Sequence, residues 1–315
     1  MKVLGTLVLI MLYHLTYSQQ TNLVTKDKDD YYEEYSVLQT DKKVKHGSYI
    51  KLKKGFFGGY ALITIGNYAN GQKDGYWENY YAKSNNIKEK GYYKNDLRDS
   101  IWVLYYPERY EKDLIEVKSN EGISLQVVDA NPVVCKSGKY KNDTIAGIWQ
   151  YYDETGELTH SYDHDSGAVT FMRNQNNQNS ENYNAGFIEG DYLFMHYLSD
   201  TFDFEGLMNS INTKIHLEPG KLTFKFTVTE NGLIDDLHCT EQTISNKKMY
   251  ARATETIQSL NGHLYPKKLN GTYQSEVKTI TFALDTESNT SWSNSGRVRS
   301  SETSMNFYLK ISIDI

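Results

Sequence analysis

Few side chains in this sequence are spaced so that they could do chemistry together. The densest group is the run His160-Ser-Tyr-Asp-His164-Asp165, whose imidazoles and carboxylates are the types that bind zinc. No further His or Cys stands near this run, so a solvated turn is preferred over a ligand set, and no metal is predicted. Cys135 and Cys239 have no identifiable activating base, and they are expected to be unpaired and buried.

Other catalytic patterns are missing from the sequence. We find no glycine-rich phosphate loop, no nucleophile with a nearby base and no convincing carboxylate pair. The sequence therefore predicts a protein that is not an enzyme and that has no catalytic residue and no cofactor. A hydrolase that uses the repeats described below to hold its substrate is kept as the third alternative, after the binding and scaffold functions given below.

The N-terminus has the pattern of a secretory signal peptide. Lys2 precedes an apolar run at 3–13, and a polar stretch follows at 16–20. The apolar run has eleven residues, whereas a membrane-spanning helix needs about 20. We therefore expect residues 1–19 to be removed, no integral membrane segment afterwards, and a periplasmic or secreted protein of a Gram-negative envelope.

Composition narrows the partners and the fold class. The formal net charge is −6, which gives no positive surface for phosphate groups, so nucleic acid is not an expected partner. The chain has 27 tyrosines and four prolines, and tyrosine is enriched in half-exposed strands. The composition therefore favours β-structure.

An internal repeat is the clearest feature of the first half. Three windows share a glycine, a tyrosine two residues later and a tryptophan eleven residues after the glycine. They hold Gly66, Tyr68 and Trp77; Gly91, Tyr93 and Trp102; and Gly138, Tyr140 and Trp149. A weaker fourth unit begins at His46-Gly47-Ser48-Tyr49, and 116–134 holds a degenerate or inserted unit.

Each window also contains a turn signal. Asn70-Gly71, Asn95-Asp96 and Asn142-Asp143 tolerate positive φ, which suits a tight turn between two strands. Each unit is therefore predicted to be a β-hairpin. Since one hairpin cannot bury its apolar face, the units should join into an antiparallel sheet with the three tryptophans in register on one side, where they chiefly hold the sheet together.

These windows resemble the MORN-repeat variant family, whose pattern is G-x-Y-x-N-G-x-x-D-G-x-W. The resemblance covers roughly 46–165, and it departs from the pattern where Asp96, Ser100, Asp143 and Ala146 replace the expected residues. It implies an extended docking surface and not catalysis.

The second half shows other periodicities. An Asn-rich stretch at 173–184 has too little apolar surface to pack, so it is predicted to be a linker. Beyond it we expect a short helix at 190–198, a hairpin at 222–238 with its turn at 230–232, a helix capped by Ser245 or Asn246, and a strand at 277–284. The Ser/Asn/Thr-rich stretch 285–304 is predicted to be a mobile loop, followed by a closing strand at 305–313.

This order resembles the C-terminal domain of TonB-like energy transducers over about 186–284. The matching places include Phe187, Gly190, Asn231-Gly232 and Tyr265-Pro266, although tryptophan is usual where Tyr265 stands. The resemblance implies that an extended peptide pairs with a free sheet edge, which would be formed by Val277, Thr279, Thr281 and Ala283. The closing strand could occupy that same edge, and its structural role is preferred.

The predicted fold class is β-rich with two domains, an antiparallel β-hairpin repeat sheet followed by an α+β TonB C-terminal-like domain. The expected divisions are a signal peptide (1–19), an acidic, solvated leader (20–45), the repeat domain (46–172), the linker (173–184) and the TonB-like domain with an added C-terminal strand (185–315). The expected function is binding of a protein partner in the envelope, such as an outer-membrane transporter. A structural or secreted scaffold without peptide binding is the alternative.

Overall fold

A computed structural model describes residues 20–55, 59–82, 86–106, 116–119, 122–125, 132–173, 181–210, 219–295 and 298–314. The predicted signal peptide and most of the predicted linker lie outside these residues. The chain divides into two compact units, Met1–Glu157 and Leu158–Ile315. Strands far outnumber helices in the described residues, so the prediction of a β-rich chain is confirmed.

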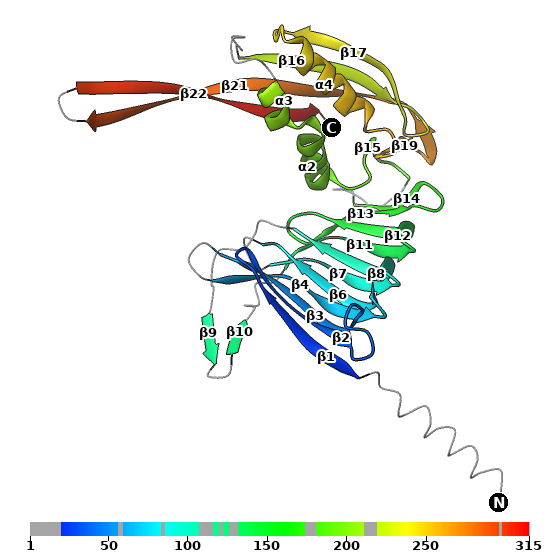
Figure 1. Ribbon diagram of the computed structural model, residues 1–315. Coiled ribbons are helices and arrows are strands. Elements are labelled where there is room, and N and C mark those ends of the chain that lie inside the picture. The colour runs from blue at the N-terminus through cyan, green and yellow to red at the C-terminus, as the bar shows by residue number, and fades with distance from the viewer. Residues whose placement is uncertain are drawn as a thin grey trace, which may run out of the picture. The chain divides into compact units, whose positions relative to one another are not determined.

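The first unit is built on a large antiparallel sheet (Figure 1). Its strands within this unit follow the order β1-β2-β3-β4-β6-β7-β8-β11-β12, with β5 paired to β4. Their bounds are β1 Thr21–Asp27, β2 Tyr31–Leu38, β3 Lys45–Lys54, β4 Tyr60–Ala69, β5 Gln72–Lys73, β6 Gly75–Tyr80, β7 Ile87–Lys94, β8 Leu97–Tyr105, β11 Val134–Lys141 and β12 Thr144–Tyr152. Nearly all neighbours are consecutive in the chain, as expected of hairpins added one after another.

The acidic segment expected to be a solvated leader is instead two strands of this sheet, β1 and β2. Glu33 of β2 is buried, which requires compensation for its charge. Tyr49 donates a hydrogen bond of 2.5 Å to Glu33, and the Nζ atoms of Lys26 and Lys45 lie 3.7 and 3.6 Å from its carboxylate. These partners come from both neighbouring strands, so the sheet itself makes burial of the acid tolerable.

The predicted turns have the expected backbone. Asn70 and Gly71 have φ of 51° and 87°, and the pairs Asn95-Asp96 and Asn142-Asp143 are likewise left-handed at both positions. This is the geometry of a type I′ hairpin turn. A second left-handed position follows five residues after the asparagine of each turn, at Gly75, Ser100 and Gly147.

Ser100→Gly is expected to stabilise the first unit by about 1 kcal/mol, because Ser100 has a φ of 61° and only glycine adopts that region freely. Urea unfolding followed by tryptophan fluorescence measures the change. Gly75→Ser, the reverse exchange at the equivalent position with a φ of 81°, should destabilise by a similar amount. Equal stability of all three proteins would contradict the strain at Ser100.

The second and third windows are neighbours in the sheet although they are far apart in the chain. β8 pairs directly with β11, through Trp102 and Gly138 among other pairs. The segment between them carries its own small hairpin, β9 (Glu116–Ser119) with β10 (Gly122–Leu125). The sequence leaves two alternatives for 116–134, a degenerate unit or an inserted one. A degenerate unit of the sheet would lie between β8 and β11, so their direct pairing fits the inserted unit.

The second unit combines strands with three described helices. It begins with the hairpin β13 (Leu158–Asp163) and β14 (Ala168–Met172) and continues with β15 (Gly186–Phe187), α2 (Asp191–Phe202) and α3 (Phe204–Ser210). Next come β16 (Gly220–Val228), β17 (Ile234–Gln242), α4 (Lys247–Gln258), β18 (Leu264–Tyr265), β19 (Lys267–Leu269), β20 (Thr272–Gln274), β21 (Glu276–Ser295) and β22 (Val298–Asp314). The predicted order of helix, hairpin, helix and strand is therefore confirmed.

The core of this unit lies between its helices and one face of a sheet with the order β17-β16-β21-β22 (Figure 1). The inward residues of β16 alternate as predicted, and Phe224 and Phe226 are almost completely buried. Asn246 caps α4, since its Oδ1 accepts from the backbone N–H groups of Lys248 and Met249 at 2.9 and 3.2 Å. The alternation along β16 and the cap of α4, both predicted from the local sequence, are therefore present in the folded structure.

One ion network holds the segment just before β15 to the sheet of this unit. Glu276 accepts from the backbone N–H of Ala185 at 2.8 Å and lies 3.1 and 3.0 Å from the Nζ atoms of Lys267 and Lys278. Burial alone would raise the pKa of Glu276, but the hydrogen bonds from Lys278, Ala185 and Lys267 lower it below its ordinary value. The carboxylate is therefore charged in the folded protein at neutral pH.

The C-terminal tail differs from its prediction in one part. The closing strand is present as β22, but 285–295 and 298–304, the described residues of the stretch predicted to be a mobile loop, belong to two long paired strands. The register runs from Thr279↔Asp314 to Ser295↔Val298. Continuous backbone pairing with the neighbouring strand therefore outweighs the loop-like composition.

Candidate functional site

The repeat motif has a direct physical explanation on one face of the first sheet, which we name the ladder face after Trp77, Trp102 and Trp149. In each window the indole lies flat against the glycine of the same window. A Cβ atom at Gly66, Gly91 or Gly138 would lie 2.1, 2.3 or 2.3 Å from the ring. The spacing of eleven residues thus pairs a large ring with the only residue that leaves room for it.

Two further contacts fix each indole. Its Nε1 donates to the carbonyl of the residue after the glycine, at 3.1 Å from Trp77 to Asn67, 3.0 Å from Trp102 to Tyr92 and 3.1 Å from Trp149 to Lys139. The repeat tyrosine of the same window then packs edge-to-face on the indole, with ring centroids 5.0 to 5.2 Å apart. Each repeat position named from the sequence therefore contributes to one packed unit.

Basic side chains that the sequence analysis did not single out complete the ladder face. Lys45, Lys73 and Arg98 each lie over two or three of its rings, at 4.4 to 5.2 Å from the centroids. Each stands four residues before a ring, namely Tyr49, Trp77 or Trp102. Tyr49 stands at the tryptophan place, opposite Gly66 as Trp77 is opposite Gly91. The prediction that the weak fourth unit begins at His46-Gly47-Ser48-Tyr49 is therefore corrected, since these residues end that unit. The shared offset of four residues was a readable signal.

The turns fasten each unit to the one before it. The Oδ1 of Asp96 accepts from the backbone N–H of Lys73 at 2.6 Å, and the Oδ1 of Asp143 accepts from that of Arg98 at the same distance. The backbone N–H groups of the two aspartates also donate to the carbonyls of Lys73 and Arg98. Both aspartates depart from the repeat pattern, and their hydrogen bonds link each unit to the one before it.

The ladder face is an internal packing surface. The three tryptophans are at most 1% exposed, so they are not available to a ligand in this structure. Their contacts lie within the sheet and stabilise it.

The opposite side of the same sheet, which we name the open face, carries exposed apolar residues. Tyr76, Ile101 and Ile148 each precede a repeat tryptophan, and Tyr92 follows a repeat glycine, so their side chains alternate away from the ladder face. They are 39, 57, 55 and 49% exposed in that order. These four residues lie on β6, β7, β8 and β12, and we name them the apolar stripe.

Register brings Tyr76 and Tyr92 directly side by side, and their rings are 5.4 Å apart at 60°. The partner of Tyr92 on β8 is Asp99, two residues from Ile101. Ile101 pairs with Lys139 of β11, the strand next to the one that carries Ile148. The stripe therefore crosses the sheet as a stepped row in which a lysine stands between Ile101 and Ile148.

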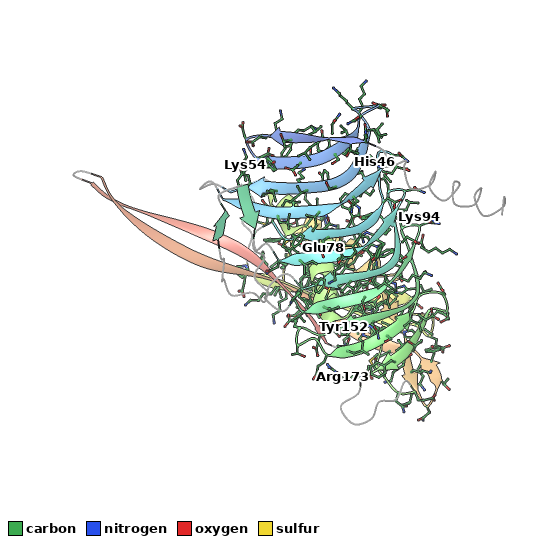
Figure 2. The ribbon with its side chains drawn as sticks, turned by 90° about the horizontal axis from the view of Figure 1, so that it is seen from below. His46, Lys54, Glu78, Lys94, Tyr152 and Arg173 are labelled. Carbon is green, nitrogen blue, oxygen red and sulfur yellow. The ribbon has the colours of Figure 1, made fainter. Side chains whose placement is uncertain are left out.

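Charged groups surround the stripe on the open face. Glu78, labelled in Figure 2, accepts hydrogen bonds from the hydroxyls of Tyr76 at 2.9 Å and Tyr80 at 2.5 Å. Burial, and then the hydrogen bond to Glu78, raises the pKa of both tyrosines, so both hydroxyls remain donors. The carboxylate of Glu78 is thus engaged within the sheet.

The two histidines considered as metal ligands have different surroundings. His160 is buried on β13, where its Nε2 lies 2.9 Å from the carbonyl oxygen of Ile188, while the ring of His164 packs against Tyr162. The solvated turn expected at 160–165 is therefore wrong for His160. In the residues that the structure describes, no group of three or more His, Cys, Asp or Glu side chains could hold a metal ion.

The second unit is expected to lose stability as the pH falls below about 6.5. Burial lowers the pKa of His160, so in that range the unfolded chain binds a proton that the folded chain excludes. Neutral His160 contributes its full stability above the pKa that this histidine has in the unfolded chain. The contribution is lost as the pH falls from that value toward the lower pKa of the folded protein. Unfolding followed by circular dichroism at pH 7.5 and 5.5 should show a smaller loss for His160→Gln, and an unchanged loss would contradict the assignment.

The expected peptide-binding edge is not an edge. β21 carries Val277, Thr279, Thr281 and Ala283, and it lies between β16 and β22 in the sheet. From Thr279 to Leu284 its residues pair on both sides. The prediction of a free edge here is corrected, because the chain's own last strand takes the place that a ligand strand would need.

Both cysteines are free, as predicted. Cys135 is buried, and desolvation raises the pKa of its thiol to about 11, so it is not a nucleophile at neutral pH. Cys239 is partly exposed, which the prediction of burial did not anticipate, and its Sγ donates to the carbonyl of Glu241 at 3.2 Å.

Comparison with models of known protein families and with curated proteins finds no match to this chain. None of the helices in the described residues is long and apolar enough to cross a membrane.

Proposed function

We propose that this chain is an exported cell-envelope protein that acts by binding another protein through the open face of its repeat sheet. The observation that carries the proposal is the apolar stripe, four exposed apolar side chains on neighbouring strands of one face. The largest apolar patch on a soluble protein often has a binding role, and tyrosine is enriched at protein interfaces. The signal-like N-terminus and the resemblance to MORN-type repeats support the export and the docking role.

For the second unit we propose a TonB-like domain that serves as a scaffold. The specific observation in favour of the scaffold is the pairing of β22 with β21, since strand addition at that place would require β22 to leave. Binding of a transporter peptide remains the second candidate for this unit, and it would have to use the outer edge of β17 or β22.

A photo-crosslinking amino acid placed at Ile101 of the full chain in its own cell tests the proposed function. We expect an adduct with a protein, which mass spectrometry would identify, and a similar adduct from Ile148. Leu23 provides a matched control, because it is 62% exposed on β1 of the same sheet and lies outside the stripe. Adducts from Leu23 alone, or no protein adduct from either stripe position, would contradict the proposal.

A further inference from the structure

The open face combines its apolar stripe with an excess of positive charge. Alternation along the strands and the pairing registers place five lysines and two carboxylates on this face of β6, β7, β8, β11 and β12. The lysines are Lys88, Lys90, Lys94, Lys139 and Lys141, and the carboxylates are Glu78 and Asp99. Since Glu78 already accepts from two tyrosine hydroxyls, the charge available to a partner is mainly positive.

The spacing of the stripe restricts what can cover it. It runs across the strands, which are about 4.8 Å apart, with Lys139 of β11 between Ile101 and Ile148. An α-helix repeats its apolar side chains with a pitch of about 5.4 Å, whereas an extended chain places same-side residues about 6.7 Å apart. A helix lying across the strands is therefore the regular element whose repeat comes closest to the stripe.

The area also favours a single helix over a second copy of this chain. Four side chains that are 39 to 57% exposed offer apolar area on the order of 400 Å². A stable subunit interface buries about 800 Å² on each partner. From Tyr76 to Ile148 the stripe crosses four strand spacings, about 19 Å, which a helix covers with about 13 residues.

We infer that the apolar stripe is the docking site for an amphipathic α-helix of a partner protein, with acidic residues flanking the helix's apolar side. This inference rests on the proposed function and specifies its partner class. The helix's leucine-type side chains cover Tyr76, Tyr92, Ile101 and Ile148, and its carboxylates lie near the lysines of β7 and β11. Tyr76 and Tyr92 are inclined at 60° and provide no coplanar platform of the kind on which flat rings or sugars stack.

The test uses the full mature chain and two synthetic peptides of about 18 residues, long enough for the stripe. Both carry leucine at helical spacing, one with glutamate and the other with lysine at the flanking positions. By fluorescence anisotropy we expect the glutamate peptide to bind with a Kd on the order of 10 μM, and the lysine peptide about tenfold more weakly or less. The difference should shrink as salt is raised.

Variants locate the site. Ile101→Glu and Ile148→Glu should each weaken the glutamate peptide about tenfold, because they bring a like charge into an apolar contact. Leu23→Ser should bind like the unchanged protein. Circular dichroism spectra that superimpose for all variants exclude unfolding as the cause, and Ile101→Ser replaces Ile101→Glu if the latter fails to fold.

Several results would overturn the inference. Equal binding of both peptides would remove the charge argument, and binding that survives both stripe variants would place the helix elsewhere. Stripe-dependent binding to vesicles of anionic phospholipid, with no binding of either peptide, would assign the stripe to a membrane surface. Protein adducts at Ile101 in the cell without peptide binding would leave the proposed function in place and reject only the helical partner.

Discussion

Gly91→Ala is expected to destabilise the first unit by about 3 kcal/mol. The added methyl group would lie 2.3 Å from the indole of Trp102, which is fully buried and fixed by its hydrogen bond to Tyr92. Either the indole leaves its place or the two strands separate, and both reduce buried apolar area. Denaturant unfolding followed by tryptophan fluorescence reports this unit, since Trp77, Trp102 and Trp149 all belong to it and Trp292→Phe removes the fourth signal.

A control and a double variant make this prediction specific. Gly59→Ala should change stability by less than about 0.5 kcal/mol, because a Cβ atom there meets nothing within 4 Å. If the indole is the cause of the clash, Gly91→Ala should cost much less in a Trp102→Leu background than alone. Additive effects of the two changes would show that the glycine is required for another reason.

Glu276→Ala is expected to destabilise the second unit by about 3 to 5 kcal/mol, the second large effect. The change leaves Lys278, whose side chain is only 7% exposed, without its ion-pair partner and removes the acceptor of the Ala185 N–H. Circular dichroism at 222 nm reports this unit, because the described helices α2, α3 and α4 all lie in it.

Two comparisons separate the buried charge from other causes. Asp285→Ala removes the exposed carboxylate that pairs with Lys310, and it should cost less than about 1 kcal/mol. Replacing Glu276 and Lys278 together by leucine and methionine should recover much of the loss, because no buried charge then remains. A double variant as unstable as Glu276→Ala would contradict this account.

The parts of the fold that could be predicted are those in which local chemistry decides. The hairpin turns follow from Asn-Gly and Asn-Asp pairs, the start of α4 follows from Asn246, and the repeat follows from an indole that needs a glycine under it. Each of these signals lies within a dozen residues, so the sequence displays it without tertiary information.

The parts that could not be predicted depend on neighbours that are distant in the chain. The sequence of β2 alone predicts a solvated acidic segment. In the fold, Lys45 and Tyr49 of the next strand contact Glu33 and allow its burial. Similarly, the Ser/Asn/Thr-rich stretch of β21 and β22 is a strand only because each half supplies the other's hydrogen bonds. In both cases the partner, and not the segment's own composition, decides its conformation.

The apolar stripe has a signal in the sequence that is separate from the glycine, tyrosine and tryptophan of the repeat. The signal is the residue just before each tryptophan. That residue is Tyr76, Ile101 or Ile148, apolar in every window, and alternation along a strand turns it to the face opposite the indole. Exposure cannot be read from one strand alone, because it depends on whether another layer covers that face.

The hydrogen bonds of Asp96 and Asp143 give the repeat sheet a direction in which further units can be added. The turns that contain Asp96 and Asp143 each bond to a strand of the unit before them, so an added unit with an aspartate at this place would bring its own contact to its predecessor. The long excursion after β8 leaves that connection unbroken. Modules could therefore be duplicated or removed during evolution, lengthening or shortening the platform without redesign of the modules that remain.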